Sequence, residues 1–318
     1  AGSNPVIHPK GKSLEAIRGF FCTYNRKIFV RFILINFTDM NPIITPNQLI
    51  EAVQTNAIVL VDATNSPTAF QNYQQSHLEG ALFVDVNTQL ADIKEDVAVG
   101  GRHPLPSPVE FSKTLSDLGI TTETWVVVYD DKNGANAAAR FWWMLRSVGH
   151  ENVQVLSGGI QAAIQAGFPV SSAVEIPNKA PLYPIQNWQW PTIDLEGMDV
   201  MIQKDAFVVI DVRESQRFKG EAEPIDLVAG HIPGATNIPF MANLDDHGFF
   251  LSTEELKTKY QNTFESIPVE NRVVHCGSGV TACHTILALA IAELPLPKLY
   301  VGSWSEWSRN SREIATDI

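Results

Sequence analysis

Ala206-Phe207-Val208-Val209-Ile210-Asp211 is a short apolar run that ends in an aspartate, and His231-Ile232-Pro233-Gly234-Ala235 follows it. A diverged copy of this order begins at residue 57, where Ala57-Ile58-Val59-Leu60-Val61-Asp62 precedes His77-Leu78-Glu79-Gly80-Ala81. Because the apolar runs and the segments after them recur at similar spacing, the sequence indicates an internal duplication of one structural unit.

Each copy alternates short apolar runs with longer stretches of helical periodicity. The run Trp125-Val126-Val127-Val128-Tyr129-Asp130 in the first copy matches Arg272-Val273-Val274-His275-Cys276 in the second. Residues 137–148 and 281–294 have the apolar spacing of helices. This alternation is typical of a parallel sheet covered by helices on both faces. We therefore predict an α/β fold with two tandem domains.

The chain divides into four parts on this interpretation. Residues 1–39 form a leader with six Lys/Arg and two Asp/Glu, residues 40–170 a first domain, residues 171–190 a proline-containing linker, and residues 191–318 a second domain. The leader includes Cys22 and begins with Ala1-Gly2-Ser3, which is typical of a cloning remnant ahead of a mobile or peripheral segment. Its basic composition also fits a mitochondrial presequence. The expected location is cytoplasmic in the first case and mitochondrial in the second.

The composition restricts the class of protein. The chain has 318 residues, of which 45% are hydrophobic, and a formal net charge of -12, so nucleic acid is not an expected partner. It contains no stretch of 18 apolar residues, and no membrane span is expected. Three cysteines do not make a disulfide framework and favour a reducing compartment.

Cys276 lies where an apolar run ends and a glycine-containing loop, Gly277-Ser278-Gly279-Val280, leads into a helical stretch. Glycine lets the backbone turn so that N–H groups face an anion, and the positive end of the helix adds to this effect. The pattern predicts an activated thiolate at the carboxyl end of a parallel sheet, where ligands bind in such folds. The alternative interpretation of Cys276 is a buried apolar cysteine with a packing role only. The first copy has Asp130 at this position, so we expect one active site per chain.

From residue 42 to 318, this arrangement resembles the tandem-domain sulfurtransferases of the rhodanese family. His231-Ile232-Pro233-Gly234-Ala235 is similar to a family signature, and Cys276-Gly277-Ser278-Gly279-Val280-Thr281 resembles the active loop of the mercaptopyruvate branch. The resemblance implies a catalytic domain behind an inactive one. It also implies a persulfide relay, in which Cys276 takes sulfur from 3-mercaptopyruvate, releases pyruvate and passes the sulfur to cyanide or to a thiol acceptor such as a thioredoxin-type protein.

The resemblance also implies roles for residues around the loop. Arg217 matches a position that holds the substrate carboxylate, and Arg213 is either a second substrate ligand or a salt-bridge partner that holds the domain. Ser278 is expected to hydrogen-bond the substrate or the sulfur, with helix capping as the alternative. His77 either assists the cysteine or is structural. The remaining residues expected in the substrate site are Gly277, Gly279, Val280 and Thr281, the last of which is also a candidate helix cap.

Two departures bear on the sulfur donor. Many mercaptopyruvate enzymes have a second arginine after a Glu-Pro pair, where this chain has Ile225-Asp226. Loss of that cation is expected to weaken substrate binding, and it keeps thiosulfate as an alternative donor. Thiosulfate-preferring relatives place Arg and Lys directly after the cysteine, whereas Gly277 and Ser278 add no charge. The uncharged loop favours a carboxylated thiol as the donor.

Other functions fit the sequence less well. A cysteine-based phosphatase loop needs an arginine six residues after the cysteine, and position 282 is alanine. A non-catalytic interaction module would have no use for the retained Cys276. The sequence contains no His/Cys cluster at metal-ligand spacing and no phosphate-binding lysine loop, so we expect no metal or cofactor.

Overall fold

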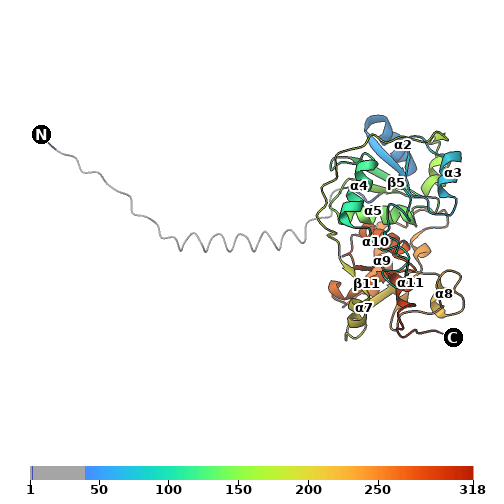
Figure 1. Ribbon diagram of the computed structural model, residues 1–318, viewed down its shortest axis with the longest axis vertical. Helices are drawn as coiled ribbons and strands as arrows, with labels where there is room; N and C mark the ends of the chain where they lie inside the picture. Colours follow the sequence, from blue (N-terminus) through green and yellow to red (C-terminus); the bar gives the residue numbers. More distant parts are fainter. Residues whose placement is uncertain (1, 3–39, 318) are drawn as a thin grey trace. The chain divides into compact units, whose positions relative to one another are not determined.

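Two five-stranded parallel sheets organise the chain in a computed structural model that describes residues 2 and 40–317 (Figure 1). The first sheet has the strand order β1-β6-β5-β2-β4, and every neighbouring pair is parallel. Its strands are β1 (Ile43–Ile44), β2 (Ile58–Asp62), β4 (Leu82–Phe83), β5 (Trp125–Tyr129) and β6 (Val153–Leu156). Apart from Gly2, the predicted leader lies outside the described residues.

The second sheet repeats this plan, in the order β10-β9-β11-β12-β8. Its strands are β8 (Thr192–Ile193), β9 (Val208–Asp211), β10 (Thr236–Asn237), β11 (Arg272–His275) and β12 (Lys298–Tyr300). The central strand β11 pairs with β9 on one side and β12 on the other. The loop after His275 therefore opens at the middle of the carboxyl edge of the sheet.

Helices cover both faces of each sheet because the buried strands are apolar on both sides. In β5, Val126 and Val128 pack into one core while Val127 and Tyr129 pack into another. The predicted α/β fold is thereby confirmed. The helices are α2 (Pro46–Thr55), α3 (Ala69–Gln75), α4 (Pro108–Asp117), α5 (Ala137–Ser147), α6 (Gly159–Gln165), α7 (Leu195–Met201), α8 (Ser215–Lys219), α9 (Thr253–Phe264), α10 (Thr281–Ile291) and α11 (Ser303–Trp307), with short 3₁₀ turns at Phe240–Asn243 and Val269–Asn271.

Helices α5 and α10 lie side by side between the two sheets (Figure 1), and their buried residues belong to one continuous apolar core. This shared core fixes the two halves of residues 41–317 against each other. Both helices are shorter than predicted. Helix α5 ends before Val148 because Gly149 adopts a left-handed φ of 84°, and α10 ends before Ala292, shortly ahead of Pro295.

The proline-containing segment between the sheets is packed rather than free. Its start, β7 (Val170–Ser171), pairs antiparallel with β3 (His77–Leu78). Further on, Trp188 stacks on Trp143 of α5 and Trp190 packs edge-on against it, with ring centroids 6.2 Å apart in both pairs. Residues 172–191 contain no helix or strand. Within the described part of the chain, no helix has the length and apolar character needed to cross a membrane.

Candidate active site

The loop that follows β11 is held in place by the first turn of α11. The backbone N–H of Cys276 donates to Ser303 Oγ at 3.2 Å. In return, the carbonyl oxygens of Cys276 and Gly277 accept from the backbone N–H groups of Trp304 at 3.0 Å and Ser305 at 2.9 Å. Cys276 is 1% exposed. The nucleophile candidate thus lies in a fixed, nearly buried position.

The predicted loop residues shape this turn. Gly279 has a φ of 72°, and a Cβ there would lie 2.6 Å from the Val301 carbonyl oxygen, so only glycine fits without strain. Val280 is buried and occupies the N-cap position of α10, where no side chain caps the helix. Thr281 is the first helical residue. The suggestion that Thr281 caps the helix is therefore wrong.

The equivalent loop of the first copy encloses the carboxyl group of Asp130, whose pKa burial raises although backbone N–H groups donate to it. Asp130 accepts hydrogen bonds from the backbone N–H groups of Lys132, Gly134, Asn136 and Ala138, at 2.8 to 3.1 Å. Around Cys276 Sγ, the hydrogen bond found in the described region comes instead from the Ser303 hydroxyl, at 4.0 Å. A carboxylate oxygen lies one bond further from the backbone than a cysteine sulfur. In the first copy, the N–H donors therefore lie at the greater of the two distances.

Ser278 begins a chain of polar groups that crosses from one half of the protein to the other. Its Oγ lies 2.8 Å from His103 Nδ1, and His103 Nε2 lies 3.2 Å from Asn87 Oδ1. Burial, together with the positive charges of Arg140 and Arg102, lowers the pKa of His103 to about 4. The imidazole is neutral at pH 7. If Nε2–H donates to Asn87, then Nδ1 is the acceptor for the Ser278 hydroxyl.

A close backbone contact between Gly101 and Gly302 places His103 beside the loop. Gly101 has a φ of 78°, and a Cβ on it would lie 2.3 Å from the Gly302 carbonyl oxygen. The flanking N–H groups of Gly100 and Arg102 donate to Glu306 Oε1 at 2.7 Å and to Ser305 Oγ at 3.0 Å. Residues 100–103 of the first half are therefore docked on α11, the same helix that fixes the cysteine loop.

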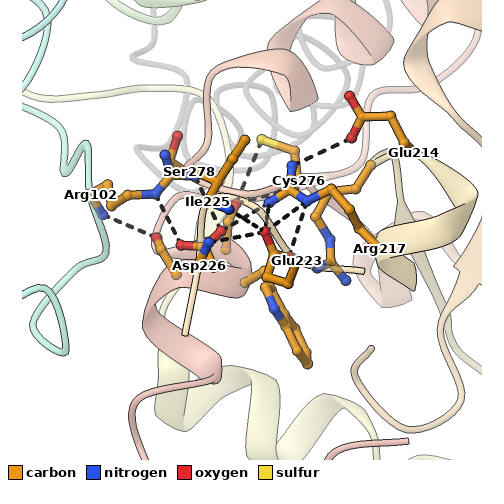
Figure 2. Close-up of polar contacts among 12 residues, drawn as sticks. Arg102, Glu214, Arg217, Glu223, Ile225, Asp226, Cys276 and Ser278 are labelled. Atoms are coloured by element: carbon orange, nitrogen blue, oxygen red, sulfur yellow. Dashed lines mark hydrogen bonds and ion pairs between the residues drawn. The ribbon is translucent and has the colours of Figure 1, made fainter. Parts of the chain in front are cut away.

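Charged side chains surround the loop although the loop itself has no charge. Figure 2 shows Arg102 and Arg217 reaching it from opposite sides, with Asp226 and Glu223 between them. Arg217 Nε lies 3.0 Å from Glu223 Oε1, and its Nη2 lies 3.1 Å from Asp226 Oδ2. Arg102 binds Asp226 through Nε and Nη2, at 3.1 and 3.2 Å. Beside this network, a surface cleft of about 440 Å³ is lined by residues that include Arg217 and Ile225.

Comparison with known proteins identifies the repeated unit. The rhodanese-like domain family matches the chain twice, over residues 45–166 and residues 195–310. The chain belongs to the rhodanese family.

The relatives similar to this chain are named for two different sulfur donors. A Pseudomonas aeruginosa protein called "Probable 3-mercaptopyruvate sulfurtransferase" is 40% identical over 76% of this chain and 84% of its own length. The "Thiosulfate sulfurtransferase" of Rattus norvegicus is 35% identical over 76% of this chain and 81% of its own length. The solved structure of "3-mercaptopyruvate sulfurtransferase from Leishmania major" matches with a TM-score of 0.73 and 29% identity, covering 85% of this chain and 75% of that one.

Two residues predicted for the site of this rhodanese make their contacts within the protein. All three guanidinium nitrogens of Arg213 donate within the protein, to Asp211, Glu223 and the Gly230 carbonyl, and its guanidinium stacks over Trp304. These contacts favour the alternative role, in which Arg213 holds the domain together.

His77 is the second of these residues. The ring of His77 stacks on that of Tyr73 with centroids 3.9 Å apart, and His77 Nδ1 lies 2.6 Å from the Tyr73 carbonyl oxygen. His231 makes the equivalent contacts in the second copy. Its ring stacks on Phe218 with centroids 3.8 Å apart, and its Nδ1 lies 2.8 Å from the Phe218 carbonyl oxygen. The histidine of the repeated motif thus packs against an aromatic ring in both copies, which favours the structural role for His77. The histidine that contacts Ser278 is His103.

Asn87, Arg102 and His103 were not predicted from the sequence, because the contacts of Arg102 and His103 with the second half join residues 203 and 175 positions apart. One signal was available. Gly100-Gly101 stands directly before Arg102-His103, and a glycine pair can indicate a close backbone approach. What the pair approaches could not be read from the sequence, because α11 lies about 200 residues further on.

A buried arginine and a second cysteine lie beneath the loop. Arg140 Nη1 donates to the Gly279 carbonyl oxygen at 3.0 Å and Nη2 to the His103 carbonyl oxygen at 3.1 Å. Cys283 Sγ donates to the same Gly279 oxygen at 3.3 Å, and burial raises the pKa of its thiol to about 12. Cys283 is therefore a core residue and not a second nucleophile. The described residues contain no group of three or more His, Cys, Asp or Glu that could hold a metal ion.

Proposed function

We propose that this protein is a sulfurtransferase that moves sulfur from 3-mercaptopyruvate, through a persulfide on Cys276, to a thiol acceptor or cyanide. The observation that carries the proposal is the cysteine loop, with the Ser278–His103 pair on one side and guanidinium groups on the other. We infer that residues 191–318 supply the nucleophile. Residues 40–170 lack a thiol at the equivalent position and supply His103.

The first half-reaction loads the sulfur. The Cys276 thiolate attacks the sulfur of the donor, an S–S bond forms, and the C–S bond breaks with its electron pair passing to the donor carbon as the enolate of pyruvate. The proton of the donor thiol ends on that carbon, which gives pyruvate and an ionised persulfide. Ser278, hydrogen-bonded to the neutral His103, is placed to accept and return this proton.

The loop geometry supports a persulfide intermediate. The outer sulfur of a persulfide lies one bond beyond Sγ, as the carboxylate oxygens of Asp130 lie one bond beyond Cγ. In the first copy, four backbone N–H groups meet those oxygens. The same strand-loop-helix unit in the second copy would favour negative charge at the outer sulfur rather than at Sγ.

The second half-reaction discharges the sulfur. A thiolate or cyanide attacks the outer sulfur, the S–S bond breaks, and Cys276 returns as a thiolate. Small sulfur donors and thiol acceptors are the substrates of sulfurtransferases in general. A thioredoxin-type dithiol is the acceptor that we propose for this chain.

Donor preference tests the proposal directly. We expect kcat/KM for 3-mercaptopyruvate, measured as pyruvate release, to exceed that for thiosulfate, measured as thiocyanate formation, by more than about tenfold, or about 1.4 kcal/mol. The reason is charge. The loop residues Gly277 and Ser278 carry no charge that would favour a dianion, and the nearby guanidinium groups already have as many carboxylate partners: the groups are Arg102, Arg213, Arg217 and Arg309, against Asp211, Glu214, Glu223 and Asp226.

Thiosulfate is the second candidate donor, because the same guanidinium groups attract any anion and a relative is named for it. A wild-type ratio below one would assign the protein to thiosulfate. Replacing Gly277 and Ser278 by Arg and Lys is the matched change, and it should lower the ratio by adding charge that suits a dianion.

Arg217→Ala should chiefly weaken binding of the donor. Loss of a charge-assisted contact costs on the order of 1.5 to 3 kcal/mol, so we expect kcat/KM for 3-mercaptopyruvate to fall roughly tenfold to a hundredfold, mainly through KM. Because Glu223 and Asp226 also lose a partner, the melting temperature must be measured alongside. Arg217→Lys, which keeps the charge, serves as the control. Unchanged kcat/KM in the alanine variant would remove Arg217 from the donor site.

A further inference from the structure

We propose that Arg102, from the first half of the chain, is a specificity-determining residue that binds the carboxylate of the sulfur donor together with Arg217. The inference rests on the proposed function, and it deepens it by making the donor site a shared one. A site of this kind takes 2-oxo acids or similar small monoanions.

The space around Gly277 places the two guanidinium groups. A Cβ on Gly277 would lie 2.7 Å from Arg102 Nη2 and 3.4 Å from Arg217 Nη2. Gly277 directly follows the nucleophile candidate, and its φ lies outside the left-handed region, so its backbone does not require glycine. Glycine is needed at position 277 because any side chain would collide with the Arg102 guanidinium group. The position that a side chain would occupy is bordered by one guanidinium group from each half of the protein and, at 3.5 Å, by Asp226 Oδ2, which both groups bind.

Within the described residues, Arg102 shares its one carboxylate partner, Asp226, with two other guanidinium groups. Its partner Asp226 is completely buried and also accepts from Arg217 at 3.1 Å and from Arg309 at 3.4 Å. One carboxylate is therefore shared by three guanidinium groups, while Glu223 is shared by Arg217 and Arg213. Arg102 keeps one terminal nitrogen, Nη1, with no protein acceptor in the described part of the chain. An anionic ligand can supply that acceptor.

Arg102 is held in this place before any ligand arrives. Its backbone N–H is bound to Ser305, its neighbour Gly101 is packed on the Gly302 carbonyl, and its guanidinium is oriented by two bonds to Asp226. A preset cation loses little conformational entropy when it binds substrate. Gly277 and Ser278 have no charged side chain, and the guanidinium group of Arg102 places a positive charge beside them.

Alkylation of Cys276 tests the inference without any sulfur transfer. 3-Bromopyruvate carries a carboxylate where bromoacetone carries a methyl group. Both reagents lose bromide when the thiolate attacks their CH2 carbon. We expect the ratio of their rates at Cys276, followed by peptide mass to separate it from Cys22, to fall roughly tenfold in Arg102→Ala. The ratio cancels any change in the reactivity of the thiolate itself.

Arg309→Ala is the matched control, because it removes another cation from Asp226 and no contact with Gly277 involves it. Its ratio should stay within about twofold of the wild type. Arg102→Lys should retain part of the preference. An unchanged ratio in Arg102→Ala, or an equal fall in Arg309→Ala, would overturn the inference.

Kinetics separate this inference from the proposed function. With 3-mercaptopyruvate, Arg102→Ala should slow loading of the persulfide through a higher KM, while discharge of a preformed persulfide to cyanide stays unchanged, since cyanide has no carboxylate. Equal losses in both half-reactions would indicate a structural role and overturn the inference. If the wild type forms no persulfide yet shows the alkylation preference and its loss in Arg102→Ala, the proposed function fails and the anion site stands.

Discussion

Cys276→Ser should abolish sulfur transfer while leaving the fold intact. Serine is close to cysteine in size and can keep the backbone contacts of residue 276 with Ser303 and Trp304. A hydroxyl group is a far weaker nucleophile toward sulfur than a thiolate, so we expect activity to fall by at least about 10³-fold. An unchanged melting temperature would show that the loss is chemical.

Intact-mass measurement gives the direct readout. After exposure to the donor and removal of the excess, the wild type should carry one added sulfur, about 32 Da, that dithiothreitol removes. The Cys276→Ser variant should carry none. Cys283→Ala is the matched control and should still load, because Cys283 is buried and burial holds the pKa of its thiol at about 12. An adduct on Cys283 or Cys22 would refute the assignment.

The fold could be predicted because its signals are local and occur twice. The apolar runs at 57–62 and 206–211 became β2 and β9, and each ends at the aspartate with which the run ends. Cys276 could be found for the same reason, since its strand, loop and helix are contiguous. The helix ends were overestimated where a glycine or a nearby proline stops the last turn.

Much of the site could not be predicted because it forms by docking of the two halves. Ser278 and His103 are 175 residues apart in the chain, and they meet only because Gly101 lets the first half approach Gly302. The repeated motif instead indicated His77, whose ring is stacked on Tyr73 in the core. Likewise, the sequence indicated one missing cation at Ile225 but not the cation that Arg102 brings to Gly277.

Ser278→Ala and His103→Ala should each slow persulfide loading by on the order of 10²-fold, the lower end of what a positioned acid-base group contributes. If the two residues act as one relay across their 2.8 Å contact, the double variant should be little slower than either single variant. Additive losses would mean that the two side chains act independently. Single-turnover release of pyruvate is the measurement, because it isolates loading from discharge.

The pH profile distinguishes a neutral relay from a charged one. Because burial and the nearby arginines lower the pKa of His103 to about 4, its imidazole stays neutral and able to accept a proton throughout the range from pH 5 to 8. His103 should therefore contribute no step to the rate of loading in that range, and acidification should slow loading only as the pH falls toward 4. Asn87→Asp puts a carboxylate 3.2 Å from Nε2, which favours the imidazolium and should raise the pKa. A new loss of loading below neutral pH in Asn87→Asp, absent from the wild type, is the expected result. A profile identical to the wild type would show that proton transfer through His103 does not limit loading.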